Sequence, residues 1–158
     1  MIHEKIGDLM AQARAGSSWM GLDLGTKTIG VAVSDRLLSS ATPLHTIRRV
    51  KFSKDAEALL EVIENREIGA IILGLPRNMD GSEGPRCQST RAFGRNLASL
   101  TDLPIGYWDE RLSTVAAERA LLEADTSRKR RAEVIDHVAA GYILQGALDR
   151  ARHIRTVG

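Results

Sequence analysis

Two short apolar segments joined by a tight turn constrain the fold of this chain more than any other feature. Residues 19–24 read WMGLDL and residues 28–34 read TIGVAVS, with Gly-Thr-Lys between them. Such a pair predicts the two strands of a β-hairpin. Asp23 interrupts the first strand between Leu22 and Leu24, where an uncompensated charge is costly. Either Asp23 faces water at a sheet edge, or a cation compensates its charge.

The remaining apolar patterns predict a sheet covered by helices. Further strands are predicted at residues 43–50, 69–76 and 104–110, and the continuous apolar run of 69–76 is typical of a parallel strand buried on both faces. Helical periodicity predicts helices over residues 54–67, 85–100, 113–124 and 132–151. We therefore expect an α/β fold with one mixed five-stranded sheet, antiparallel over its first three strands and parallel afterwards, flanked by helices.

Length and composition predict one main domain. The chain has 158 residues, enough to bury about 70% of its unfolded surface. Its one cysteine, Cys87, cannot form an intrachain disulfide, and no Cys/His cluster indicates zinc. We expect a helical extension at residues 1–18, the domain itself at 19–150 and a C-terminal tail at 151–158. No signal-peptide core or membrane-length apolar run is present, so we expect a cytoplasmic protein without a membrane partner.

Three acidic residues lie at positions where a ligand site is expected. Glu110 ends the predicted strand 104–110, and Asp136 lies in the first turn of the last predicted helix, at the edge of its apolar stripe. Taken alone, Glu110 is better explained by ordinary solvation of a strand end, and the helix dipole explains an acid at Asp136 on structural grounds. Together with Asp23 they can converge across one sheet face, where three carboxylates repel each other unless a cation binds. Asp23, Glu110 and Asp136 are therefore predicted to hold Mg²⁺ or Mn²⁺, and two such ions about 4 Å apart would suit phosphodiester hydrolysis.

Basic residues gather in two clusters, although the formal net charge is only +2. The clusters consist of Arg77, Arg86, Arg91 and Arg95, and of the run SRKRR with Arg128, Lys129 and Arg130. Either cluster could bind a polyanion, and an ordinary solvated helix face explains each cluster equally well.

Four segments, in order, resemble the YqgF/RuvX-type family. They are GLDLGTKTIGVAVSD at 21–35, ILGLPRNMDGSEGP at 72–85, DERLSTVAAERAL at 109–121 and VIDHVAAGYILQGALD at 134–149. Members of this family have been described as Holliday junction resolvases and as nucleases that process the 5′ end of pre-16S rRNA. The resemblance implies an RNase H-like fold related to the RuvC resolvases. It also implies a divalent-metal nuclease with its acidic residues at Asp23, Glu110 and Asp136.

The resemblance also implies where nucleic acid would bind. Thr26 and Lys27, in the hairpin turn, are expected to contact the phosphate of the scissile strand. The remaining candidates are donors of the glycine-rich loop and of the basic clusters, namely Asn78, Ser82, Arg86, Arg91, Arg95, Arg128, Lys129 and Arg130. Arg77 departs from the family pattern, because an apolar residue is expected at its position.

Other functions remain open. DLGTKTIG also resembles the phosphate hairpin of actin- and hexokinase-type ATPases, but those proteins need two such domains, for which this chain is too short. A non-catalytic nucleic-acid-binding protein on the same scaffold is the second alternative. Among nuclease substrates, the resemblance favours structured RNA over branched DNA, and the aromatic content of 4% fits recognition of the phosphate backbone. Monomer and homodimer are both compatible with the sequence.

Overall fold

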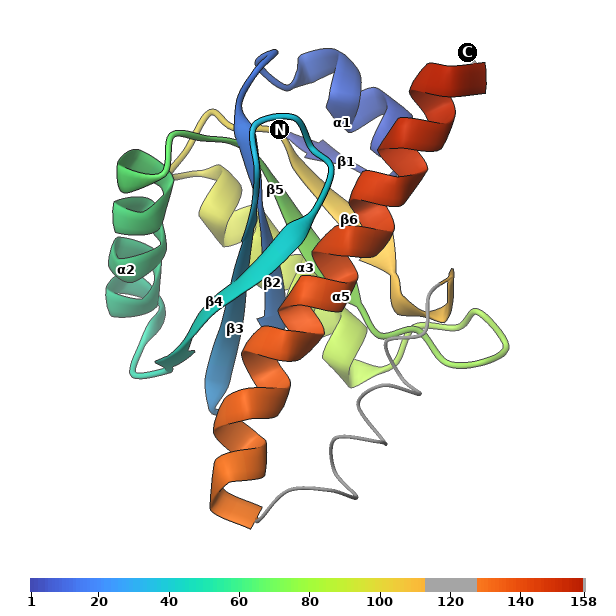
Figure 1. Cartoon of the computed structure of the whole chain (residues 1–158). Coiled ribbons are helices and arrows are strands. Elements are labelled where there is room, and N and C mark those ends of the chain that lie inside the picture. The colour runs from blue at the N-terminus through green and yellow to red at the C-terminus, as the bar shows by residue number, and fades with distance from the viewer. Residues whose placement is uncertain (113–127, 158) are drawn as a thin grey trace.

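A mixed six-stranded sheet forms the centre of the molecule, in the order β1-β6-β5-β2-β3-β4 (Figure 1). The computed structural model describes residues 1–112 and 128–157, and for residues 128–136 and 157 it describes only the backbone. The strands are β1 (Ile2–His3), β2 (Ser18–Leu24), β3 (Thr28–Ser34), β4 (Ala41–Arg48), β5 (Ile68–Leu75) and β6 (Ile105–Asp109). β2, β3 and β4 pair antiparallel, whereas β5 runs parallel to both β2 and β6. The expected α/β fold with a mixed sheet is confirmed.

The predicted count of five strands is wrong because the N-terminal segment adds a sixth strand. Ile2 and His3 pair in parallel with Ile105 and Gly106 of β6. Two residues are too few to show the alternation by which a strand is recognised in a sequence.

Helices cover both faces of the sheet. They are α1 (Ile6–Gln12), α2 (Phe52–Asn65), α3 (Pro85–Ala98) and α5 (Arg128–Val157), with a 3₁₀ turn η1 (Glu110–Leu112) after β6. α5 and α1 pack on one face of the sheet, and α2 and α3 on the other (Figure 1). Residues 151–157, expected as a tail, continue α5, because Ala147, Leu148 and Ala151 extend its buried side. The helix expected at 113–124 lies outside the described residues. No described helix is long and apolar enough to cross a membrane.

β5 shows why the sheet has two cores. All eight residues of this strand are buried. Ile71, Leu73 and Leu75 enter the core beneath α2 and α3, whereas Ala70 and Ile72 enter the core beneath α5. The continuous apolar run is therefore the pattern of a strand covered on both sides.

α5 lies very close to β2, and Gly21 makes this approach possible. A Cβ at Gly21 would lie 2.6 Å from Cβ of Leu144 and 3.1 Å from the carbonyl oxygen of Ala140. Real side chains do not tolerate such distances, so the helix contacts the bare backbone of the strand. The face of β2 that carries Gly21 is thus the face that α5 covers.

Candidate active site and nucleic-acid contacts

Asp23 lies on the α5 side of β2, near the strand's carboxyl end. It is two residues after Gly21, so both point to the same face, and its exposed fraction is only 4%. In the antiparallel direction it pairs with Gly30. In the parallel direction Leu22 pairs with Leu73, which places Gly74 beside Asp23 when the register continues. Asp23 therefore has a glycine on either side of it in the sheet.

Glu110 reaches the same face from the end of β6, which β5 separates from β2. It is the first residue of η1, directly after β6, and is 8% exposed. Its Oε2 lies 3.2 Å from the position that a Cβ of Gly74 would take. Cδ1 of Ile143, in α5, would lie 2.4 Å from the same Cβ. The structure thus brings two of the three predicted acids, Asp23 and Glu110, to one edge of the sheet on either side of Gly74.

Asp136 lies in α5, and its side chain is outside the described part of the structure. Its backbone is one helical turn before Ala140. The carbonyl oxygen of Ala140 would lie 3.1 Å from a Cβ on Gly21. The next residue, His137, shares a hydrogen bond of 2.9 Å between its Nδ1 and Oγ1 of Thr46. Thr46 pairs with Gly30, which pairs with Asp23, so one row across the sheet links Asp23 to α5 at His137. Because α5 begins at Arg128, Asp136 lies more than two turns into the helix and not in its first turn, as the sequence had suggested. Convergence of all three acids remains a prediction.

The turn between β2 and β3 presents Thr26 and Lys27 to solvent. Backbone hydrogen bonds hold it, from the Gly25 N–H to the Thr28 carbonyl at 2.8 Å and from the Arg49 N–H to the Lys27 carbonyl at 2.8 Å. Arg49 also donates from Nη1 to the Gly25 carbonyl at 2.6 Å. Both predicted phosphate contacts, Thr26 and Lys27, are thus exposed on a turn whose backbone is fixed from β4. Arg49 was not recognised in the sequence, because this contact joins residues that are distant along the chain.

The loop after β5 is organised around Asp80. Asn78 donates from Nδ2 to Oγ of Ser82 at 3.0 Å, and Ser82 donates from Oγ and N to Oδ1 of Asp80 at 2.5 and 2.9 Å. These bonds from Ser82 lower the pKa of the Asp80 carboxyl. Gly81 has φ of +89°, which favours glycine at this turn. The hydroxyl proton of Ser82 is therefore used within the loop, and Asn78 remains exposed beside it.

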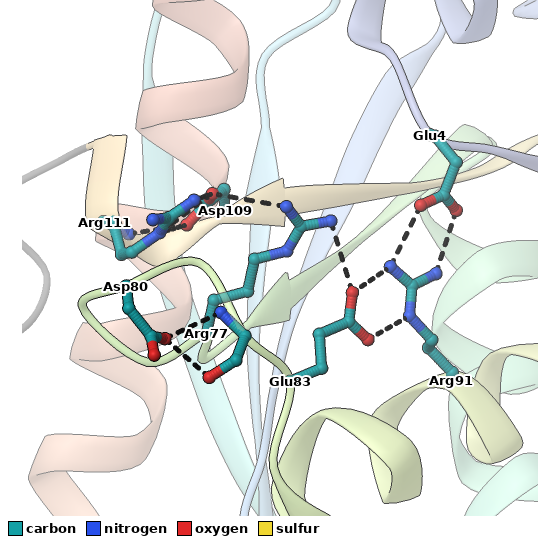
Figure 2. Close-up of polar contacts among 8 residues, drawn as sticks. Glu4, Arg77, Asp80, Glu83, Arg91, Asp109 and Arg111 are labelled. Carbon is teal, nitrogen blue, oxygen red and sulfur yellow. Dashed lines mark hydrogen bonds and ion pairs between the residues drawn. The ribbon is translucent and has the colours of Figure 1, made fainter.

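Arg91 takes part in an ion-pair network that crosses the edge of the sheet (Figure 2). It donates from Nε to Glu83 at 2.6 Å and from Nη1 and Nη2 to Glu4 at 3.0 Å each, and it stacks over the Tyr107 ring at 4.8 Å. The two carboxylates raise the pKa of Arg91, and Arg91 in turn lowers the pKa of Glu83. The charge of Arg91 is already compensated, so its geometry favours a role in the structure over the predicted contact with nucleic acid.

Arg77 extends the same network to the end of β6. It lies 3.3 Å from Glu83 and 3.9 Å from Asp109, which in turn accepts from Nη2 of Arg111 at 2.7 Å (Figure 2). The bonds from Arg111 lower the pKa of Asp109. Arg77 therefore occupies the position where an apolar residue was expected. It forms an ionic link between the loop and β6, the strand directly before Glu110.

The remaining predicted basic contacts are spread more widely. Arg86, at the start of α3, donates from Nη2 to the Leu24 carbonyl at 3.3 Å and so lies against the end of β2. Arg95 is exposed on the same helix. The side chains of Arg128, Lys129 and Arg130 lie outside the described residues, although the backbone of these three residues begins α5.

Comparison with known proteins gives consistent results. The model of the family described as "RuvX: Holliday junction resolvase" matches residues 17–150. A protein of Ruegeria sp. (strain TM1040), named "Putative pre-16S rRNA nuclease", is 72% identical over 156 residues, which are 99% of this chain and 99% of the relative. A relative of the same name from Paracoccus denitrificans (strain Pd 1222) is 75% identical over 134 residues, covering 85% of each chain.

Among solved structures, Thermus thermophilus RuvC in complex with a Holliday junction substrate has a similar fold. The TM-score is 0.54 at 14% sequence identity, with 87% of this chain and 96% of that chain covered. At this identity the likeness shows a shared fold, in agreement with the RNase H-like architecture expected from the sequence.

Proposed function

This chain belongs to the RuvX family, and on that basis we propose that it is a metal-dependent endonuclease that processes the 5′ region of pre-16S rRNA. The names of relatives about 70% identical over nearly the whole chain support the substrate. The observation that carries the reaction class is the placement of Asp23 and Glu110. Two buried carboxylates from adjacent parts of the sheet flank a bare glycine at the carboxyl end of parallel strands. Processing of ribosomal RNA implies a cytoplasmic location.

The residues fit a hard divalent cation. Asp23 and Glu110 supply carboxylate oxygens, the ligands that Mg²⁺ and Mn²⁺ prefer, and the missing Cβ of Gly74 lets the Glu110 carboxylate lie against β5. We assign the metal to Asp23, Glu110 and Asp136. A bound divalent cation supplies a more acidic water and stabilisation of the leaving oxygen.

The chain's own residues then hold the substrate. Lys27 is an exposed cation on a fixed turn, three residues beyond the strand that bears Asp23, and it would neutralise a phosphate next to the scissile one. Asn78 would donate to the backbone from the loop on the other side of Glu110. The burial of Asp23 and Glu110 limits the water around them and holds their carboxylates in place before substrate binds.

The second candidate function is cleavage of Holliday junctions. The description of the family model and the fold shared with RuvC favour it. A resolvase that cuts two strands of a twofold-symmetric junction would act as a homodimer, whereas single cuts in a precursor RNA need only a monomer.

The test compares substrates and variants in one assay. Purified protein is incubated with a pre-16S rRNA 5′ fragment and, separately, with a synthetic four-way junction, each with Mg²⁺ and with EDTA. We expect Mg²⁺-dependent cuts in the RNA. Asp23→Asn and Glu110→Gln should abolish them and keep or strengthen RNA binding, because each removes a negative charge near the phosphate. Asp8→Asn, an exposed acid on α1, is the matched control. Unchanged cleavage by Asp23→Asn would end the assignment of the nuclease site, and cuts in the junction alone would favour the second function.

A further inference from the structure

A cavity of about 550 Å³ lies beside the β2–β3 turn, on the face of the sheet opposite to Asp23 and Glu110. The turn closes one side of the cavity through Gly25 and Thr26, and the first turns of α2 and α3 close the others. Leu24, which also lines it, belongs to the core beneath α2 and α3, and this fixes the face on which the cavity opens. The mechanism proposed above uses only the rim of this cavity.

The lining of the cavity is cationic. Arg49, Lys51 and Arg86 contribute three positive charges, and Asp55 is the one acid among the lining residues. Asp55 is only 3% exposed and accepts from the Val50 N–H at 3.1 Å, while Nε of Arg49 lies 3.8 Å from its other oxygen. Within the described residues, Arg86 uses only Nη2 in a hydrogen bond, so its other N–H groups are available to a ligand. The cavity therefore keeps a net charge of +2 from these four residues.

The backbone adds further donors to the same space. α2 and α3 each contain 14 residues, and neither N-cap residue, Lys51 or Gly84, makes a side-chain capping bond. The first N–H groups of such helices carry a partial positive charge and are open to an anion; in α3 these begin at Arg86, because Pro85 has no N–H. Two uncapped helix starts and three cationic side chains converge on one cavity, and that combination selects for phosphate.

We propose that this cavity binds a phosphate of the substrate strand that flanks the scissile phosphodiester. The proposal rests on the nuclease function given above. Thr26 lines the cavity and is three residues from Asp23, so their Cα atoms are at most about 11 Å apart. A strand that crosses the turn can therefore place one phosphate at the acids and another in the cavity. The subsite would hold the strand by its backbone, without reading its sequence.

Ser89 offers a clean test because it is exposed, lines the cavity and makes no hydrogen bond within the described residues. Ser89→Asp places a negative charge in the cavity and is compatible with the early turns of a helix. Gln88→Asp puts the same charge on the adjacent exposed position, outside the lining, and is the matched control. Binding of a fluorescent single-stranded oligoribonucleotide is followed by anisotropy in EDTA at several salt concentrations. We expect Ser89→Asp to weaken binding about fivefold and to reduce the slope of log K against log salt by about 0.7, the value of one phosphate contact.

Equal effects of Ser89→Asp and Gln88→Asp, or no effect of either, would overturn the subsite. A titration of the unmodified chain with inorganic phosphate, followed by NMR, gives an independent readout. The backbone amides of Arg86 and Ser53 should shift, and shifts confined to other regions would also overturn it. Cleavage assays on the same samples separate the two proposals. Cleavage by the unmodified chain with unaltered binding by Ser89→Asp refutes the subsite alone, whereas weakened binding without any cleavage supports the subsite and refutes the nuclease.

Discussion

Oε2 of Glu110 lies over Gly74, only 3.2 Å from the position of a Cβ on that residue. A methyl group at this point would clash with Cδ1 of Ile143 and press on the Glu110 carboxylate, so the lack of a side chain at Gly74 lets both residues lie against β5. β5, which separates Asp23 from Glu110, thus contributes to the candidate site because Gly74 has no side chain.

Gly74→Ala is therefore expected to impair cleavage beyond its effect on stability. Overpacking against Ile143 should cost about 1–3 kcal/mol in the free energy of unfolding, and displacement of Glu110 should lower the cleavage rate about 10- to 100-fold. Gly106→Ala serves as the control. Gly106 lies on β6, which leads to Glu110, and its new Cβ would lie 2.6 Å from Cδ1 of Leu9, away from the end of the strand. Denaturant unfolding and initial rates, measured where both variants are folded, give the comparison. Equal rate losses in the two variants would show that only packing is involved.

Arg91→Gln should lower stability and leave RNA affinity nearly unchanged. The substitution removes the charge that Glu4 and Glu83 share, as well as the stacking on Tyr107, at a cost of about 1–2 kcal/mol. Arg95→Gln, one turn further along α3 and exposed, should change stability by less than about 0.5 kcal/mol. Thermal unfolding and anisotropy on both variants test this. A large loss of RNA affinity in Arg91→Gln at unchanged stability would contradict the structural role.

Lys27 is expected to contribute one phosphate contact to binding. Lys27→Gln should reduce the salt dependence of single-stranded RNA binding by about 0.7 in the log–log slope. Lys54→Gln, an exposed lysine of α2 that pairs only with Glu57 in the described part of the chain, should leave the slope as it is. The measurement is anisotropy between low and moderate salt in EDTA. If the slope of the unmodified chain is already flat, backbone recognition is not the basis of binding.

Asp35 should make stability depend on acid pH. Hydrogen bonds from Oγ of Ser39 and from the N–H groups of Ser40 and Ser39 lower its pKa from 3.8 to about 2. The ionised carboxylate thus stabilises the fold at pH values above about 4, and this contribution is lost as the pH falls towards 2. Asp35→Asn should cost about 1 kcal/mol at pH 7, a value reduced for solvent screening, and almost nothing near pH 2. Urea unfolding at both pH values, with Asp102→Asn as an exposed control, checks the difference, which a pH-independent loss would contradict.

Local patterns were enough to predict much of this fold. Short apolar runs predict both the hairpin around residues 25–27 and β5, the strand covered on both faces. Such runs are visible in the sequence because they involve only residues that are neighbours along the chain. Asp23 and Glu110 were recognisable because a charge within or directly after an apolar strand needs an explanation. Residues 2 and 3 were not recognised as a strand, because their pairing depends on the free edge of β6.

Contacts between distant residues account for what the sequence did not reveal. Arg91 and Arg95 have the spacing of neighbours on one helix face, and this favoured a shared basic surface. The partner Glu4 lies 87 positions away from Arg91, so no local pattern could assign the two arginines to different roles. The same holds for Arg49, whose contact with Gly25 spans 24 positions.

The bond between Glu4 and Arg91 connects the first few residues with the end of β6, directly before Glu110. Glu4 shares the guanidinium of Arg91 with Glu83, and Glu83 is also the partner of Arg77, which reaches Asp109 beside Glu110. Removing the first five residues would take away one of the two carboxylates that bind Arg91, whereas the contact between Arg77 and Asp109 would remain. A change of the first five residues is therefore expected to alter the partners of Arg91 and, through Glu83, the setting of Arg77 in the loop after β5.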